Sequence, residues 1–136
     1  MPFKEYTMAY LILRIMINAL SIVAAVKFVD GITFSGEWWK MIIIGALFGL
    51  MNSFIKPIVM LFTLPFIIFT LGLFTLIINT LMLILTSFLS DSLNLGLQIN
   101  GFWPAFWGAL IISIVSMLLS WLTGAKTIKY YRDSDR

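Results

Sequence analysis

Residues 56–82 read KPIVMLFTLPFIIFTLGLFTLIINTLM, and the apolar run that they begin continues to Ser90, with no charged residue before Asp91. A single membrane-spanning helix needs about 20 residues, and two would need roughly 40 and a turn between them. The segment 57–90 is therefore too long for one crossing and too short for two. The way in which it folds decides the architecture of the chain.

Two prolines and a glycine punctuate this segment. Pro57 and Pro65 each lack a backbone N–H and disfavour a straight helix, and Gly72 offers a flexible joint. We predict a short, proline-broken helix over residues 56–70, either re-entrant or lying in the cytoplasmic interface, followed by a true span over 71–90. A break at membrane depth survives only where protein or water satisfies the backbone. The alternative is one long, kinked and tilted helix.

The composition is that of an integral membrane protein. Of the 136 residues, 61% are hydrophobic and 11% are charged, whereas soluble domains are roughly half apolar and a quarter charged. The chain has no cysteine and no histidine, which excludes disulfides, thiolate chemistry, most zinc sites and the usual general base. We therefore expect an all-α integral membrane protein without a metal or cofactor.

Four apolar segments fit four transmembrane helices within a single domain, residues 1–136. The predicted spans cover about 8–28, 38–54, 71–90 and 102–123. An even number of spans puts both termini on one side of the membrane. The positive-inside rule makes that side the cytoplasm, because Lys4, Lys56 and a basic tail over 124–136 share it. The tail is too short to suggest nucleic-acid binding.

Two short matches recur in the same order along the chain. Ile17-Asn18-Ala19-Leu20 resembles Ile78-Asn79-Thr80-Leu81, and the eight residues from Gly31 to Trp38 resemble those from Gly96 to Trp103. The chain is thus interpreted as two tandem helical hairpins related by a pseudo-two-fold axis along the membrane normal. Chance similarity between apolar segments is the alternative. Both outer loops alternate apolar and polar residues, which predicts extended segments that either pair or lie on the membrane surface.

Small and polar residues recur at helical spacing in each span. Gly45, Gly49, Ala109 and Ser113 are predicted helix-packing positions, because small residues let membrane helices approach closely. The same faces could serve contacts between copies, and we expect a homo-oligomer.

A second set of polar residues falls in the cytoplasmic half of the predicted spans. Its members are Arg14, Asn18, Asn52, Lys56, Thr75 and Asn79. An intramembrane charge is costly and indicates function, and no Asp or Glu lies in any span to pair with it. The cluster therefore suits an anion or an anionic lipid head group better than a cation. Helix packing, and snorkelling of the two cations toward the interface, are the alternatives.

The order of motifs in the middle of the chain resembles a known family. Asn52-Ser-Phe-Ile-Lys-Pro57 is followed by Leu64-Pro65, Thr70-Leu-Gly-Leu-Phe74 and Ile78-Asn79. This order resembles the YvlD-like family of small membrane proteins, also called phage holin family 4 or mycobacterial four-span phage holin superfamily IV. The resemblance runs from Arg14 through the fourth span, and Lys56 takes a basic position that is often arginine in the family. It implies a small four-span protein of the bacterial cytoplasmic (inner) membrane.

Functions from different classes remain open at this point. Holins assemble and open the membrane so that an endolysin escapes, so the resemblance and the small-residue faces favour a self-associating, membrane-permeabilising protein. The polar cluster favours a non-lytic envelope protein that binds or moves an anionic lipid or supports envelope stress resistance. An accessory subunit of a larger membrane complex is a third hypothesis. The sequence indicates no enzyme, because it shows no nucleophile–base pair and no metal-ligand cluster.

Overall fold

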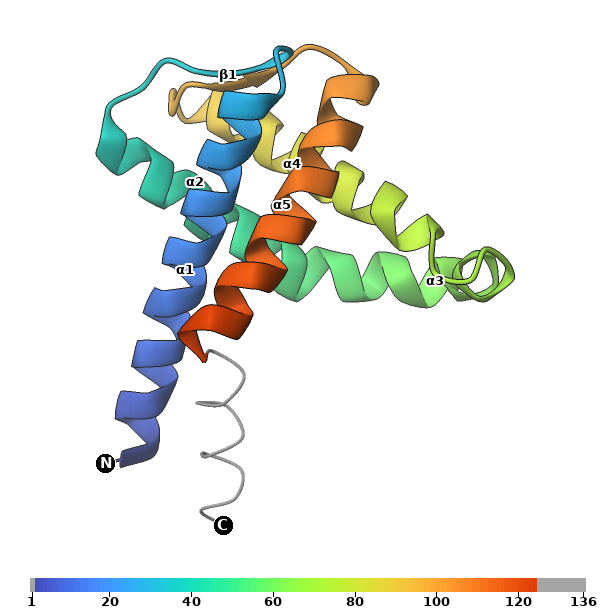
Figure 1. Ribbon diagram of the computed structural model, residues 1–136, viewed down its shortest axis with the longest axis horizontal. Coiled ribbons are helices and arrows are strands. Elements are labelled where there is room, and N and C mark those ends of the chain that lie inside the picture. The colour runs from blue at the N-terminus through green and yellow to red at the C-terminus, as the bar shows by residue number, and fades with distance from the viewer. Residues whose placement is uncertain (1, 125–136) are drawn as a thin grey trace.

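The computed structural model describes residues 2–124, with side chains from residue 7 onward. It is almost entirely helical, with one short two-stranded ribbon (Figure 1). The elements in chain order are α1 (Pro2–Phe28), β1 (Ile32–Phe34), α2 (Trp38–Leu50), the π-helix η1 (Met51–Ile55), α3 (Lys56–Phe69), α4 (Phe74–Ser92), β2 (Leu97–Ile99) and α5 (Phe102–Thr123). All but the first residue of the predicted basic tail lies outside the described residues.

Four helices are long and apolar enough to cross a membrane, as the sequence predicts. They comprise Thr7–Phe28, Trp38–Phe69, Phe74–Ser92 and Phe102–Thr123. The second contains 32 residues, well beyond the roughly 20 that a bilayer requires. This extra length is the part of the fold that needs explanation.

The helices form a bundle with two distinct ends. α1 and α5 lie side by side, α2 packs against α1, and α4 packs against α5 (Figure 1). α1 begins and α5 ends at the same end, which we call the terminal end (Figure 1). The opposite end carries β1 and β2, and we call it the ribbon end.

The loop after α1 and the loop after α4 meet and pair at the ribbon end. β1 and β2 are antiparallel, with Ile32 opposite Ile99, Thr33 opposite Gln98 and Phe34 opposite Leu97. Because the repeat aligns residue 31 with residue 96, Thr33 is paired with its own counterpart in the second hairpin. Pairing, one of the two arrangements that the alternation allows, is therefore the observed one.

Hydrogen bonds that flank the ribbon obey the same symmetry. Asn100 donates its backbone N–H to Gly31 O at 2.8 Å, and Ser35 donates to Gly96 O at 3.0 Å. In the repeat, Gly31 corresponds to Gly96 and Ser35 corresponds to Asn100, so each of these bonds is the counterpart of the other. A local two-fold axis thus passes through the Thr33–Gln98 pair, as expected for two hairpins that enter the ribbon in the same direction.

A continuous apolar core separates the ribbon from the terminal half of the bundle. Ile32 and Leu97 point from the ribbon into the bundle and are buried. Below them Ile22, Ile44 and Leu83, from three different helices, are completely buried in the same cluster. Burial among side chains rather than against lipid fixes how the four spans meet.

The predicted break at the prolines is wrong, because α2, η1 and α3 form one uninterrupted helical stretch. Pro57 lies in the first turn of α3 and Pro65 inside it. The Lys56 N–H reaches back to Met51 O, a π-type bond that spans one residue more than the α-helical bond. The π-helix therefore changes the hydrogen-bond register just before Pro57, and the helix continues through the proline instead of ending.

The chain reverses at Thr70–Leu73, at the predicted boundary between residues 56–70 and 71–90, and the predicted joint Gly72 lies in this turn. Leu71 and Gly72 both have positive φ, of 58° and 92°, and the Gly72 N–H donates to Ile67 O at 2.8 Å. Left-handed residues of this kind close the carboxyl end of a helix. Residues 57–90 are consequently two helices and not one kinked helix. The re-entrant or interfacial placement of 56–70 in the bilayer stays a prediction.

α3 and the start of α4 project sideways from the bundle, away from α1 and α5 (Figure 1). We call residues 58–76 the arm. α3 packs on η1 and α4 only in part, and none of its residues is buried. The rings of Phe66 and Phe74 stack across the turn with centroids 5.6 Å apart. A charge-free arm of this kind is compatible with hydrocarbon and not with water.

Candidate functional site

A polar cavity lies where α1, the end of α2, η1, α3, α4 and α5 converge, in the terminal half of the bundle. Its volume is about 290 Å³, close to the lower limit of roughly 300 Å³ for ligand pockets. The lining residues are Arg14, Asn18, Phe48, Asn52, Lys56, Asn79, Ile112, Ser113, Ser116, Met117 and Ser120. A space of this size suits a head group or a small anion and not a whole lipid.

Five of the six predicted cluster residues line this cavity. Arg14 and Asn18 come from successive turns of α1, and Asn79 comes from α4. Asn52 lies in η1 and Lys56 four residues later, at the start of α3. The sixth, Thr75, is not among the lining residues, because it lies one turn before Asn79, where α4 still belongs to the arm.

Side chains from distant parts of the sequence are tied together around the cavity. Arg14 donates from Nη1 to Ser120 Oγ at 2.5 Å. Asn79 donates from Nδ2 to Ser113 Oγ at 3.3 Å. These two bonds attach α1 and α4 to α5, so the cavity wall is held by its own polar groups. Such bonds between membrane helices contribute about 0.6 kcal/mol on average.

Asn18 and Asn52 complete the amide set. Asn18 is buried and donates from Nδ2 to Gly45 O on α2, at a long 3.4 Å. Asn52 Oδ1 is buried without a hydrogen-bond partner. An unpartnered buried acceptor costs about 1–3 kcal/mol, so this oxygen marks a place where the arrangement is incomplete. It lies within a π-helix, a feature that is frequent at functional sites.

The cavity is electropositive. Arg14 and Lys56 supply two cationic side chains, and no carboxylate lines the cavity. Among residues 7–124, whose side chains the structure describes, the acidic residues are Asp30, Glu37 and Asp91, which all lie toward the ribbon end. An anion in this cavity would therefore meet two cations without competition from a neighbouring carboxylate.

Sequence reasoning missed part of the cavity wall. Ser116 and Ser120 line it, although their spacing on α5 by itself indicates only a packing stripe. The steps of three and four from Ser113 through Ser116 to Ser120 are the signal that could have identified this wall. Phe48, Ile112 and Met117 carry no such signal, because apolar residues are everywhere in this chain.

The predicted packing residues lie in two places. A Cβ on Gly45 would stand 2.8 Å from Ala19 N and 2.9 Å from Ile15 O, so α1 and α2 cross in close contact at this glycine. Gly49 lies beside Asn18 Nδ2. Ala109 is buried in α5, whereas Ser113 lines the cavity. Their further role in contacts between copies stays a prediction.

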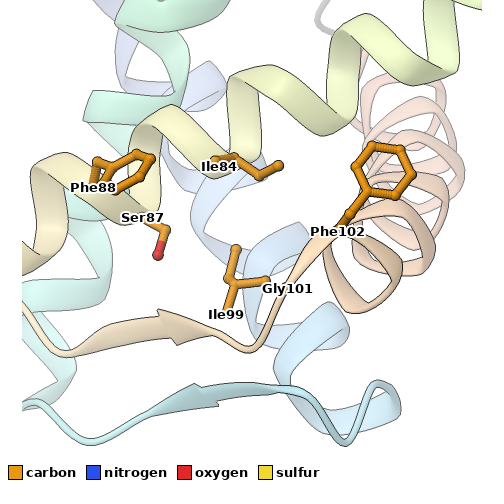
Figure 2. A pocket seen from close by; sticks show the side chains of 6 residues that line it. All are labelled: Ile84, Ser87, Phe88, Ile99, Gly101 and Phe102. Carbon is orange, nitrogen blue, oxygen red and sulfur yellow. The ribbon is translucent and has the colours of Figure 1, made fainter.

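A second cavity, of about 320 Å³, opens near the ribbon end between α4, β2 and the start of α5. Figure 2 shows its wall, made of Ile84, Ser87, Phe88, Ile99, Gly101 and Phe102. Its surface is mainly apolar, and Ser87 contributes the one polar side chain of the wall. Within residues 7–124 no group of three or more Asp, Glu, His or Cys side chains could hold a metal ion.

The fold and the polar cavity together define a small helical membrane protein with four spans. The chain belongs to the family described as mycobacterial four-span phage holin, superfamily IV, whose model matches residues 9–118, and this confirms the predicted family. It is similar to an uncharacterized protein of Streptomyces coelicolor, with 43% identity over 114 residues that cover 80% of this chain and 91% of the relative.

The chain is also similar to the uncharacterized membrane protein YvlD of Bacillus subtilis. The two are 36% identical over 106 residues, which cover 77% of this chain and 85% of that protein. No solved structure matches the chain. The comparisons therefore fix the family and the four-span class, and the cavity is the starting point for a specific function.

Proposed function

We propose that this protein binds the phosphate-bearing head group of an anionic lipid in its polar cavity, as a non-lytic component of the bacterial envelope. The observation that carries this proposal is the pair of cations, Arg14 and Lys56, that share one cavity lined by no carboxylate. A cation at the centre of a membrane helix costs about 2.5–3.5 kcal/mol on insertion scales. A bound phosphate would offset part of that cost.

The proposed setting is the inner leaflet of the cytoplasmic membrane, with both termini in the cytoplasm. By sequence, residues 1–6, 56 and 124–136 carry six Lys or Arg and three Asp or Glu, whereas the loops between spans one and two and between three and four, with their flanks, carry Lys27 and Lys40 beside Asp30, Glu37 and Asp91. The positive-inside rule then directs the terminal end inward. The cavity would then lie at the level of the lipid head groups of the inner leaflet.

The apolar core favours a protein that binds a lipid head group over one that moves it across the membrane through a single copy. Ile22, Ile44 and Leu83 are completely buried between the polar cavity and the ribbon. A polar group that left the cavity toward the ribbon end would have to cross this packed layer. The cavity is therefore proposed as a site with access from one leaflet.

Copurified lipid tests the proposal. The full-length protein is purified in mild detergent, and bound phospholipid is quantified per protein for the wild type, Arg14→Gln, Lys56→Gln and the double variant. Anionic lipid should fall several-fold in each single variant and further in the double variant. Lys27→Gln is the matched control, because it removes an exposed cation of α1 outside the cavity. Equal lipid retention in all five proteins would refute the proposal.

Membrane permeabilisation by assembled copies is the second candidate function. Two observations favour it: the holin-type family and the apolar arm, whose Phe62, Phe69 and Leu71 are at least four-fifths exposed. Because the core closes a single bundle, permeabilisation would require contacts between copies. Potassium and dye leakage is measured in cells at graded expression levels. Abrupt leakage above a threshold supports this function, and an intact membrane potential at every tolerated level argues against it.

A further inference from the structure

The hydrogen-bonding groups of the polar cavity point to a more specific ligand than an anionic head group in general. The cavity combines two kinds of group that a bare phosphate cannot satisfy together. Arg14 and Lys56 are donors with a positive charge, whereas the three asparagines also supply carbonyl oxygens. The question is which of these groups the protein already satisfies by itself.

Two of the three amide nitrogens make one hydrogen bond each within the described part of the protein. Asn18 Nδ2 donates to Gly45 O, and Asn79 Nδ2 donates to Ser113 Oγ. Each of these two amides therefore commits one of its two N–H groups to a helix contact. Each amide keeps its second N–H and a carbonyl oxygen that accepts no hydrogen bond from a described residue, so both groups remain for a ligand.

Among the described residues, no hydrogen-bond donor reaches the three amide oxygens. Asn52 Oδ1 is buried and unpartnered. No hydrogen bond from a described residue reaches the side-chain oxygen of Asn18 or of Asn79. The cavity thus presents acceptor oxygens next to two cations. Acceptors of this kind repel phosphate oxygens and attract O–H or N–H groups.

The serines extend this mixed character. Ser113 and Ser120 each accept one hydrogen bond, from Asn79 and Arg14. A serine hydroxyl that accepts can still donate its own proton, so both remain able to bind an oxygen of a ligand. The wall therefore offers donors for a phosphate and acceptors for groups beside the phosphate.

We propose that the cavity selects a polyol phosphate, that is, a phosphate ester whose other substituent carries free hydroxyl groups. The cations would hold the phosphate oxygens, and the oxygens of Asn18, Asn52 and Asn79 would accept from the hydroxyls. The glycerol head group of phosphatidylglycerol has this chemistry, and so does soluble glycerol phosphate. Phosphatidic acid supplies no alcohol hydroxyl, and phosphatidylethanolamine supplies N–H donors without net negative charge. This inference rests on the proposed function and narrows its ligand.

The test compares ligands that differ only in the head group. Full-length protein in nanodiscs of neutral lipid is titrated with phosphatidylglycerol, phosphatidic acid and phosphatidylethanolamine of identical acyl chains. We expect phosphatidylglycerol to bind about tenfold more tightly than phosphatidic acid, since one net hydrogen bond of roughly 1.4 kcal/mol corresponds to a factor of ten. Glycerol phosphate and inorganic phosphate, added in solution, form the second arm. Competition by glycerol phosphate alone at similar concentrations would assign the site to the soluble compound.

Variants connect the preference to the amide oxygens. Asn52→Leu keeps a similar volume and removes the acceptor, so the tenfold preference should fall to about twofold or less while binding of phosphatidic acid persists. Gln98→Leu removes an exposed amide of the ribbon and is the control. A thermal melt of each variant reports whether it folds. If Asn52→Leu does not fold, the affinities of the wild-type protein for the three lipids still test the polyol inference.

The outcomes separate the two proposals. Equal affinity of the wild type for phosphatidylglycerol and phosphatidic acid would overturn the polyol inference and leave the anionic-lipid function standing. Equal affinity for all three lipids would overturn both. A preference for phosphatidylglycerol that Asn52→Leu leaves intact in a folded protein would also overturn the inference, because the buried oxygen would then have no part in selection.

Discussion

Arg14 on α1 donates a 2.5 Å hydrogen bond to Ser120 on α5, 106 positions away in the sequence. The acceptor is neutral, so the bond orients the guanidinium without cancelling its charge. It also joins the first and last helices of the fold at the terminal end. The same contact therefore serves structure and leaves a cation available to a ligand.

A double-mutant cycle measures this bond. Ser120→Ala should lower the free energy of unfolding by about 0.5–2 kcal/mol, because the guanidinium loses an acceptor in a dry environment. Arg14→Gln combined with Ser120→Ala should cost less than the sum of the single changes. Thermal or denaturant unfolding in detergent gives the four values. Additive effects would mean that the two side chains do not interact in the folded protein.

The close crossing of α1 and α2 gives a second prediction. Gly45→Ala puts a Cβ within 3 Å of the backbone of Ala19 and Ile15, and overpacking against atoms that cannot move costs typically about 1–3 kcal/mol. Gly49→Ala is the matched variant, because its Cβ meets only the Asn18 Nδ2 atom, at 3.1 Å. Unfolding experiments should find Gly45→Ala clearly less stable. Equal stability of the two variants would contradict the predicted helix crossing.

The turn between α3 and α4 gives a third prediction, which depends on backbone conformation and not on steric contacts of the added side chain. Gly72 has φ of 92°, and a Cβ added to it would meet no atom within 4 Å, so Gly72→Ala should cost about 1–2 kcal/mol through backbone conformation alone. Leu71, at φ of 58°, already bears such a strain. Leu71→Gly should recover about 1 kcal/mol of it. If both variants unfold at the wild-type temperature, the turn has another conformation in the membrane.

The class of fold is predictable from the sequence because hydrophobicity and length alone require it. The reversal near residue 71 is predictable from Gly72, whereas the predicted break at the prolines is absent, because proline acts as a helix breaker only in some positions. At Pro57 the preceding π-helix changes the register, and at Pro65 the helix continues. Within the reversal, Leu71 adopts a positive φ beside Gly72. A leucine gives no sequence signal for that conformation.

The candidate site is predictable in part, and the limits have a physical basis. Charges and amides in an apolar span are conspicuous because each is costly there, so Arg14, Asn52 and Lys56 can be grouped from sequence. Serine is compatible both with close packing and with hydrogen bonding, so the sequence alone indicates only packing for Ser120. Thr75 shares a helix face with Asn79, and periodicity cannot reveal that the arm leaves the bundle before the cavity begins.

The symmetric ribbon gives a prediction that the absence of cysteine makes easy to check. Thr33→Cys with Gln98→Cys places two exposed thiols directly opposite each other in the ribbon, where Cβ atoms are about 5 Å apart. A short bifunctional thiol reagent should join them and protect both from later labelling with a maleimide polymer. Thr33→Cys with Asp91→Cys is the control pair. Equal protection in both pairs would contradict the observed register.

The proposed orientation gives the last prediction, and the same single cysteine tests it. If the termini lie in the cytoplasm, the ribbon lies on the outer side of the cytoplasmic membrane. A membrane-impermeant maleimide that can pass the rest of the cell envelope should then label Thr33→Cys in intact cells. A cysteine at Gly124, just after α5 at the terminal end, should react only after the membrane is opened. The reverse pattern would invert the topology. It would also move the cavity to the outer leaflet, and the lipid that Arg14 and Lys56 meet would then be sought there.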